Sequence, residues 1–290
     1  MRLHRVACLL GFALACQEEV MPSASPDASD AARPADAAPP ADGAPHEDAG
    51  PPPLPGWDLI WSDEFDGSGN PDPTKWGYEV GYLRNSELQY YTSGRLENAR
   101  VENGHLVIEA RRDFWQGHEI TSASLTTQGK AAFRYGRIEV RAQIPTGNGT
   151  WPAVWTLGTN IDAVGWPTCG EIDIMENVGF MPTTIYGTVH RAAQNGSGRG
   201  GSVDVTAPFR DYHRYAIEWF PDRIDFFVDD QKYFTYANDG GGVATWPFDA
   251  DQYLLLNLAI GGSWGGQQGV DLSLFPHSYL IDYVRVYRHQ

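Results

Sequence analysis

The sequence predicts an all-β domain in which two antiparallel sheets pack as a β-sandwich. From residue 57 onward the chain is rich in Trp, Tyr, Phe, Val and Ile, which favour strands. Clusters of Gly, Pro, Asn and Asp interrupt these stretches at roughly regular intervals, as turns do. No stretch repeats apolar residues with a sustained helical period between capping residues. Many short strands joined by turns are typical of a two-sheet sandwich.

The first 16 residues have the pattern of an export signal. Two arginines precede an apolar stretch from Val6 to Ala15, which is too short to span a bilayer. Cleavage after Ala15 by a general signal peptidase fits the sequence, but Cys16 directly after a small residue also resembles the lipobox of bacterial lipoproteins. We therefore expect a secreted protein or a cell-surface lipoprotein of a bacterium, and a membrane contact only through a lipid on Cys16.

Residues 17–56 differ in composition from the rest of the chain. They contain half of the 20 prolines, many alanines and acidic residues, and almost no large apolar side chain. Such a segment cannot bury enough surface to offset its chain entropy, so we expect a disordered linker. The folded domain is expected to be residues 57–290.

Charge and cysteine content exclude several classes of function. The chain has a formal net charge of −16, which disfavours nucleic acid, anionic lipid and sulfated polymers as partners and favours a neutral polymer. Cys8 is removed with the signal and Cys16 lies at the new terminus, so the domain holds only Cys169. This excludes an intradomain disulfide and a four-cysteine zinc site, and we expect Cys169 to be a buried small apolar residue.

The strands with the clearest alternating pattern follow one another along the whole domain. Asn103-Gly104 precedes the first of them as a turn, and Asp229-Asp230 has the composition of a hairpin turn between two runs. The predicted strands are 106–111, 135–144, 212–219, 223–228, 253–259 and 280–287. Phosphate-binding loops, the helical zinc-protease motif and the Gly-x-Ser-x-Gly motif are absent from the sequence, which disfavours those enzyme classes.

Three tryptophans lie beside Gly, Pro or polar residues, where a core strand would not place them. Trp151, Trp166 and Trp264 are therefore predicted to be loop residues that stack on sugar rings, whereas Trp61 and Trp219 are predicted to pack in the core.

Residues 170–177, GEIDIMEN, form an acidic strand. Alternation places Glu171 and Asp173 on one face and Ile172 and Ile174 on the other. Strict alternation would send Glu176 to the apolar face, but one extra residue at 174–175 returns it to the face of the other two acids. The spacing therefore predicts a β-bulge.

Like charges on one strand raise one another's pKa, so one acid is expected to be protonated while another is ionised. Glycoside hydrolysis uses this division, because one carboxylate attacks the sugar carbon while a carboxylic acid protonates the leaving oxygen. On the acids alone, a solvated acidic face or a calcium site remains an alternative.

Seven segments resemble the laminarinases of glycoside hydrolase family 16, which are endo-β-1,3-glucanases with a jelly-roll fold. They are residues 60–67, 85–92, 135–142, 151–155, 170–177, 187–190 and 281–287, in the same order as in the family. The resemblance implies a concanavalin-like jelly roll with a concave cleft, a retaining mechanism on neutral β-glucan without a catalytic cofactor, and a monomer.

The resemblance also implies roles for individual residues. Glu171 would be the nucleophile, Glu176 the general acid and base, and Asp173 the residue that controls the proton and charge of the nucleophile. The implied substrate-binding residues are Asn85, Arg137, Trp151, Trp155, Trp166, His190, Asn257 and Trp264. Arg137 in a structural ion pair, and Trp155, His190 or Asn257 as packing residues of the sheet, are the alternatives.

A structural calcium ion on the convex side is a further implication. Its ligands would be the backbone carbonyls of Glu64 and Gly104 and the carboxylate of Asp282. The chain departs from the family at residues 81–85, where many relatives have a loop tryptophan. Tyr82 or Arg84 is expected to take its place at the edge of the cleft.

The bulged acid motif resembles laminarinases rather than lichenases, whose motif is one residue shorter. Agarases share the bulge, and a mixed-linkage β-1,3/1,4-glucan is a neighbouring substrate, so both remain alternatives. A non-catalytic glucan-binding protein is the alternative from another class, but such proteins typically lack one or both glutamates.

Overall fold

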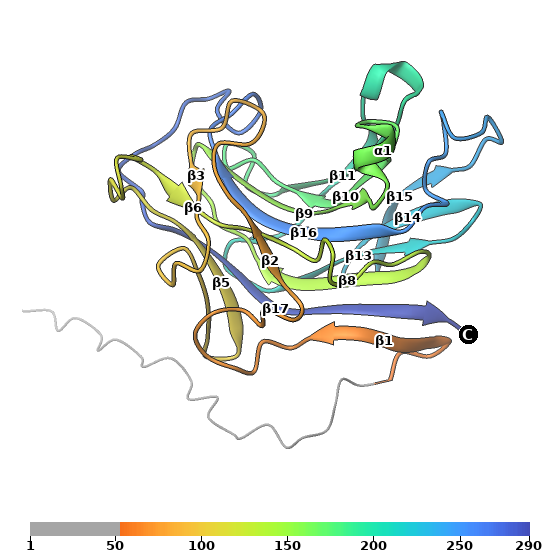
Figure 1. Cartoon of the computed structure of the whole chain (residues 1–290), viewed down its shortest axis with the longest axis horizontal. Coiled ribbons are helices and arrows are strands. Elements are labelled where there is room, and N and C mark those ends of the chain that lie inside the picture. The colour runs from red at the N-terminus through yellow and green to blue at the C-terminus, as the bar shows by residue number, and fades with distance from the viewer. Residues whose placement is uncertain (1–52) are drawn as a thin grey trace, which may run out of the picture. The chain divides into compact units, whose positions relative to one another are not determined.

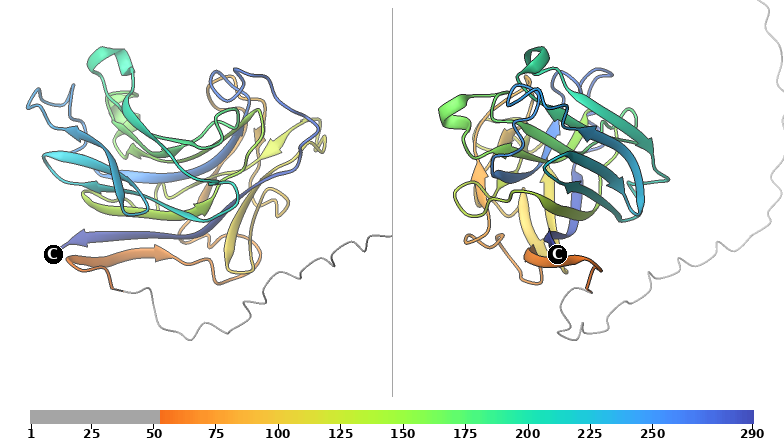
Figure 2. Two further views of the ribbon diagram at one scale, coloured as in Figure 1. Left: turned by 180° about the vertical axis from the view of Figure 1, so that it is seen from behind. Right: turned by 90° about the vertical axis from the view of Figure 1, so that its right-hand side faces the viewer.

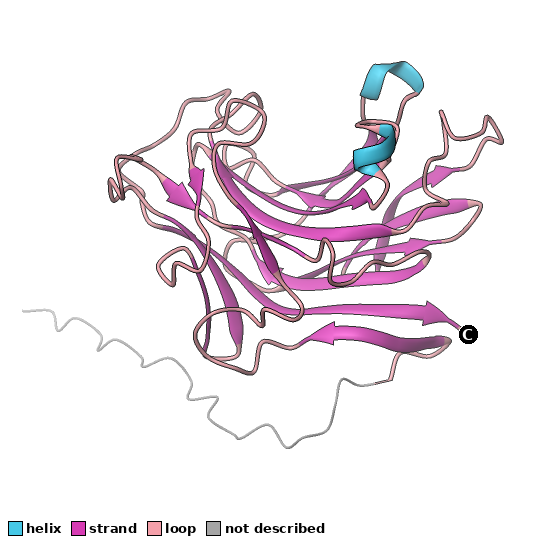
Figure 3. Cartoon of the chain, in the orientation of Figure 1, coloured by secondary structure: helices cyan, strands magenta, loops and turns pink. Residues whose placement is uncertain are grey.

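Two antiparallel sheets pack face to face in residues 53–290, the part of the chain that the computed structural model describes (Figures 1 and 3). The predicted all-β sandwich is confirmed. The predicted signal peptide (1–16), the candidate lipid site Cys16 and the linker up to residue 52 lie outside the described residues. Within 53–290, no helix is long and apolar enough to cross a membrane.

The first sheet has eight strands and forms the lower layer in Figure 1. Its order is β15 (Gln231–Ala237), β14 (Arg223–Val228), β13 (His213–Trp219), β8 (Gly136–Gln143), β17 (His277–His289), β5 (His105–Ala110) and β4 (Ala99–Glu102). Strand β1 (Trp57–Asp63) pairs with residues 284–289 of β17. The long strand β17 therefore joins both ends of the described chain to the centre of this sheet.

The second sheet has seven strands and forms the upper layer. Its order is β12 (Arg199–Asp204), β11 (Thr184–His190), β10 (Glu171–Glu176), β9 (Thr150–Gly158), β16 (Gln252–Ile260), β7 (Ser124–Thr126) and β2 (Gly77–Glu79). Its strands are bowed, and loops rise beyond both ends of the bow, which Figure 2 shows from two further directions. The bow produces a concave face that points away from the first sheet.

The core fills the space between the sheets. Alternate residues of β10 and β8, including Ile172, Ile174, Ile138 and Val140, are at most 1% exposed. This alternation is the pattern that predicted the strands, and the six strands predicted most clearly are confirmed to within three residues at each end. Asp229 and Asp230 join β14 to β15 as the predicted turn.

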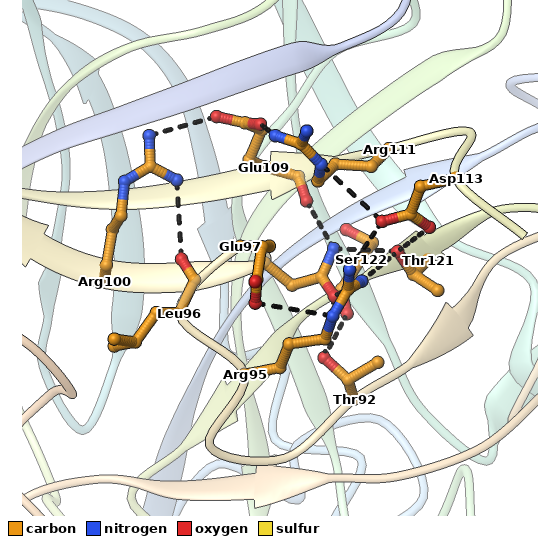
Figure 4. A network of polar contacts seen from close by, with 11 residues as sticks. Thr92, Arg95, Leu96, Glu97, Arg100, Glu109, Arg111, Asp113, Thr121 and Ser122 are labelled. Atoms are coloured by element: carbon orange, nitrogen blue, oxygen red, sulfur yellow. Dashed lines mark hydrogen bonds and ion pairs between the residues drawn. The ribbon is translucent and has the colours of Figure 1, made fainter. Parts of the chain in front are cut away.

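A small parallel pair, β3 (Tyr90–Tyr91) and β6 (Thr121–Ser122), lies at one end of the sandwich. Figure 4 shows the polar network that ties it to the first sheet. Asn98 Nδ2 donates to Thr121 Oγ1 (3.0 Å) and to the Glu109 carbonyl (2.9 Å), and Arg95 donates to Asp113 (2.6 Å). The network fixes the segment that leads from β3 to β4 of the first sheet. Two single-turn helices, α1 (Ile161–Val164) and η1 (Ala193–Gly196), lie in loops beside that face.

Candidate active site

The acidic strand β10 carries the predicted bulge. Glu171 pairs with His190 and Asp173 with Thr188 on β11, and the register then shifts before Glu176 pairs with Tyr186. On the other side, pairing with β9 shifts between Asp173 and Met175, so Ile174 is the inserted residue. Ile174 and Met175 both face the core. Two consecutive inward residues return Glu176 to the face of Glu171 and Asp173, as the spacing predicts.

All three acids line one cleft of about 630 Å³ on the concave face. Ten of the eleven catalytic and substrate-binding positions expected from the sequence lie in this lining, all except Arg137. The lining residues are Arg84, Asn85, Glu87, Trp151, Ala153, Trp155, Leu157, Ile161, Trp166, Glu171, Asp173, Glu176, Thr188, His190, Asn257, Ala259 and Trp264.

Arg137 lies elsewhere, and its assignment as a sugar ligand is wrong. It belongs to β8 of the first sheet, is 6% exposed, and forms ion pairs with Glu139 (2.5 Å) and Glu218 (3.0 Å). The signal for this role was present in the sequence, because residues two apart on a strand share a face and Glu139 follows Arg137 at that spacing.

Two tryptophans hold the outer acids rather than only offering stacking surfaces. The Trp166 indole N–H donates to Glu171 Oε2 (2.7 Å), and the Trp151 indole N–H donates to Glu176 Oε1 (2.9 Å). Trp151 is the second residue of β9, so its prediction as a loop residue is wrong, whereas Trp166 lies in the loop after α1, as predicted. The two donors therefore approach from different segments. Each donor fixes one carboxyl oxygen and leaves the other free for a substrate.

His190 faces Asp173 across the β10–β11 pair. Its Nε2 lies 3.1 Å from Asp173 Oδ2, while its Nδ1 lies 2.8 Å from the Gly196 carbonyl and donates to it. Asp173 is 3% exposed, and among residues 53–290 its Oδ2 has no hydrogen-bond partner of good geometry. The central acid is therefore buried, with His190 beside this oxygen.

Burial and like charges shift the protonation of this cluster. Burial raises the pKa of Asp173 well above its usual range, and the charges of Glu171 and Glu176 add to the effect. Burial also raises the pKa of Glu176, and the charge of Glu171 raises it further, whereas the hydrogen bond from Trp151 lowers it. The resulting pKa of Glu176 is about 7. Burial lowers the pKa of His190, but contact with Asp173 and the charge of Glu171 raise it to about 10. The cluster therefore retains protons at neutral pH.

A series of side-chain hydrogen bonds connects the cleft to the loop before β3. Trp155 Nε1 donates to Asn257 Oδ1 (2.8 Å), and Asn257 Nδ2 donates to the Tyr91 hydroxyl (2.9 Å). Tyr91 in turn donates to Glu87 Oε2 (3.3 Å). Asn257 thus lines the cleft with both of its polar atoms already in use. Neither Tyr91 nor Glu87 was predicted as a site residue, because the bond from Asn257 to Tyr91 spans 166 positions of the sequence.

Arg84 occupies the edge where many relatives have a loop tryptophan. Its guanidinium lies 4.7 Å from the Trp155 ring centre and forms an ion pair with Glu79. Tyr82 is 57% exposed, is absent from the cleft lining, and contacts His118 and Tyr90 instead. Of the two expected replacements, Arg84 is the one in the cleft.

The positions implied for calcium lie on the first sheet, away from the cleft. Asp63 pairs with Val284 and Leu106 pairs with Ile281. Glu64 follows Asp63 directly, and Gly104 lies two residues before Leu106, so both are close in sequence to residues that pair with β17 on either side of Asp282. Asp282 lies at a register shift of β17, and its carboxylate forms an ion pair with Arg141 (2.5 Å). The calcium ligand set stays a prediction, and in this structure the carboxylate of Asp282 is paired with Arg141.

Comparison with known proteins identifies relatives of the whole domain. Residues 86–285 match the family model described as glycosyl hydrolases family 16. A β-glucanase from Rhodothermus marinus is 52% identical over 246 residues, which are 81% of this chain and 86% of that protein. The X-ray structure of the laminarinase from the same organism covers 81% of this chain and 99% of its own, with a TM-score of 0.78. A non-specific endo-β-1,3(4)-glucanase, SCLam, is 45% identical, covers 82% and 93%, and has a TM-score of 0.77.

Proposed function

The chain belongs to glycosyl hydrolase family 16, and from this premise we propose that it is a retaining endo-β-1,3-glucanase, a laminarinase that cleaves β-glucan chains. The observation that carries the proposal is the bulge in β10, which brings Glu171, Asp173 and Glu176 to one face inside an aromatic cleft. The β-glucanase and laminarinase relatives support the choice of substrate.

In the first step, Glu171 attacks the anomeric carbon of the bound sugar. A bond forms between that carbon and a Glu171 oxygen, the glycosidic bond breaks, and Glu176 gives its proton to the leaving oxygen. A pKa of about 7 keeps a large share of Glu176 protonated in neutral solution, as a general acid requires. Trp166 holds one oxygen of Glu171, so the other is the attacking atom.

In the second step, water replaces the enzyme on the sugar. Glu176, now ionised, takes a proton from the water, whose oxygen forms a bond to the anomeric carbon as the bond to Glu171 breaks. Two displacements at one carbon return it to its original configuration. Asp173, buried between the two glutamates, changes its share of the proton with His190 as charge moves between its neighbours.

Substrate binding is assigned to the aromatic walls of the cleft. Trp166 lies in the loop between α1 and β10, and Trp264 lies in the loop between β16 and β17. Trp155 lies on the floor of the cleft, under Arg84. Flat apolar rings suit the faces of glucose units, and the polar edges of Asn85 and Glu87 suit their hydroxyl groups. A neutral polymer also agrees with the strongly acidic chain.

The experiment that tests this function is a comparison of polymers. The protein is incubated with laminarin, curdlan, lichenan, agarose and xyloglucan, and products are sized over time. We expect a rapid fall in the length of β-1,3-linked chains and β-anomeric products first by NMR. Mixed-linkage lichenan is the second candidate substrate, because SCLam is a non-specific endo-β-1,3(4)-glucanase. Cleavage of agarose alone, or initial α-anomers, would contradict the proposal.

We further propose that a calcium ion stabilises the convex side. The carbonyls of Glu64 and Gly104 and the carboxylate of Asp282 would hold it, and it would supply local charge balance rather than chemistry. Removal of calcium with EDTA should then lower the midpoint of thermal unfolding, and added calcium should restore it. An unchanged midpoint would argue against the site.

We propose export on the basis of the leader sequence, with Cys16 as a lipid attachment point. We also propose that the folded domain is a monomer. Metabolic labelling with a palmitate analogue tests the lipid, since labelling should disappear in Cys16→Ser. Gel filtration tests the monomer.

A further inference from the structure

The floor of the cleft has the donor set of a zinc site. One oxygen of Glu171, one of Asp173 and a ring nitrogen of His190 all lie within 4.8 Å of one another. Imidazole with carboxylates is a set that suits Zn²⁺ and related first-row ions, whereas Ca²⁺ and Mg²⁺ prefer shells made of oxygen. We propose that Glu171, Asp173 and His190 form an inhibitory site for Zn²⁺ on the floor of the cleft.

Asp173 and His190 are spaced as two ligands of one ion would be. Asp173 Oδ2 lies 3.1 Å from His190 Nε2, and among residues 53–290 it has no hydrogen-bond partner of good geometry. Two ligands of a tetrahedral zinc ion are separated by about 3.3 Å. Because Asp173 is 3% exposed, this buried oxygen cannot turn to bulk water for a partner. An ion at the cleft floor would satisfy it.

The surroundings of His190 fix the ring as a metal ligand requires. Nδ1 donates to the Gly196 carbonyl at 2.8 Å, which directs Nε2 toward the acids. A ligating histidine almost always donates its other ring N–H to such an acceptor. Trp166 restrains Glu171 in the same way, by donating to Oε2.

The site would be open, with three protein ligands and a free position toward the cleft. Three ligands with an open position are typical of zinc ions that exchange and bind small molecules. Zn²⁺ at this place displaces the proton from His190 Nε2, captures Glu171 and occupies the floor beneath the substrate. The inhibitory effect rests on the proposed function, whereas binding of the ion does not.

Binding is tested on the full chain without substrate. Zn²⁺ is titrated by calorimetry, and Co²⁺ is titrated by visible absorption, which reports the ligand geometry. We expect one ion per chain, and a loss of affinity of at least about 10-fold in His190→Gln and in Glu171→Gln. His118→Gln is the matched control, because His118 is a partly exposed histidine outside the cleft, and it should bind as the unmodified chain does. Circular dichroism checks that each variant is folded.

Failure of the unmodified chain to bind, or equal affinity in folded His190→Gln and Glu171→Gln, would overturn the zinc site. Inhibition is tested on laminarin with Zn²⁺, Ca²⁺ or Mg²⁺ at equal concentration. Zn²⁺ alone should raise KM with little change in kcat, and EDTA should reverse it. If no glucan is hydrolysed at all, the proposed function fails while the binding experiment still decides the site.

Discussion

Buried acids on the two sheets have opposite surroundings. On the first sheet Glu109, Glu139 and Asp225 are at most 5% exposed, and each forms an ion pair with an arginine. On the concave sheet Asp173 is equally buried, but two further glutamates and a single histidine surround it.

The pKa values follow this difference. Burial raises the pKa of Asp225, but bonds from Thr235 and Arg223 outweigh it, and the net pKa is lowered. Among the described residues no arginine forms an ion pair with Asp173, and burial with two like charges raises its pKa. Acids that stabilise the fold are thus neutralised by arginine, whereas the acids of the cleft are left able to hold and release protons.

The largest effect is expected when the proton donor of the cleft, Glu176, is replaced. Glu176→Gln cannot protonate a leaving group, so kcat/KM on laminarin should fall by about 10²–10⁴-fold. The leaving group of an activated aryl glycoside departs without a proton. The burst of aryl product that reports attack by Glu171 should therefore be nearly unchanged in Glu176→Gln. Azide should restore turnover in Glu176→Ala, because it attacks without a general base. Rescue of Glu171→Ala alone, with an α-glycosyl azide as product, would exchange the two roles.

On the first sheet the expected effect is on stability. Arg137→Met leaves Glu139 and Glu218 without their cation, and removal of one partner from a buried pair costs about 3–5 kcal/mol. Urea unfolding measures this, with Arg288→Met as the control, since Arg288 is exposed and its nearest acid lies 3.9 Å away. The control should change stability by less than about 0.5 kcal/mol. A defect in activity per folded molecule, with stability unchanged, would return Arg137 to the substrate site.

Substitution of Glu176 should raise stability, whereas substitution of Arg137 should lower it. The pKa of Glu176 is raised from 4.5 to about 7 on folding, so the unmodified chain loses stability as pH rises through this window. Glu176→Gln does not titrate there, and should be more stable than the unmodified chain by roughly 2–3 kcal/mol at pH 8. The two should agree at pH 4, where the glutamate is protonated in both states. Equal urea midpoints at pH 8 would show that this carboxyl is not strained by burial.

Removal of the bulge itself is also expected to reduce activity. Deletion of Met175 removes the extra residue and shifts Glu176 by about 3.3 Å relative to the groups around it. We expect a folded but less stable variant whose activity is reduced by at least about 10²-fold. Met175→Leu keeps the bulge and the buried volume, and should remain nearly fully active per folded molecule. Full activity after deletion would mean that the bulge does not position the acid.

The sequence predicted what alternation along one strand can encode. The facing of Glu171 and Asp173, the bulge that returns Glu176, and the burial of Cys169 all follow from residues close together in the chain. Strands of two or three residues such as β3 and β6 were not predicted, because so few residues have no measurable period. The chain from Trp155 through Asn257 to Tyr91 was also missed, since its members meet only through the pairing of distant segments.

Trapping of the nucleophile tests the account most directly. A 2-deoxy-2-fluoro laminaribioside with an activated leaving group should form a stable covalent adduct, because the fluorine slows its hydrolysis more than its formation. Digestion and mass spectrometry should place the sugar on Glu171, and Glu171→Gln should remain unlabelled while Arg288→Met is labelled in full. A sugar attached to Glu176, to Asp173 or to any acid of the first sheet would contradict the division between the two sheets on which the account rests.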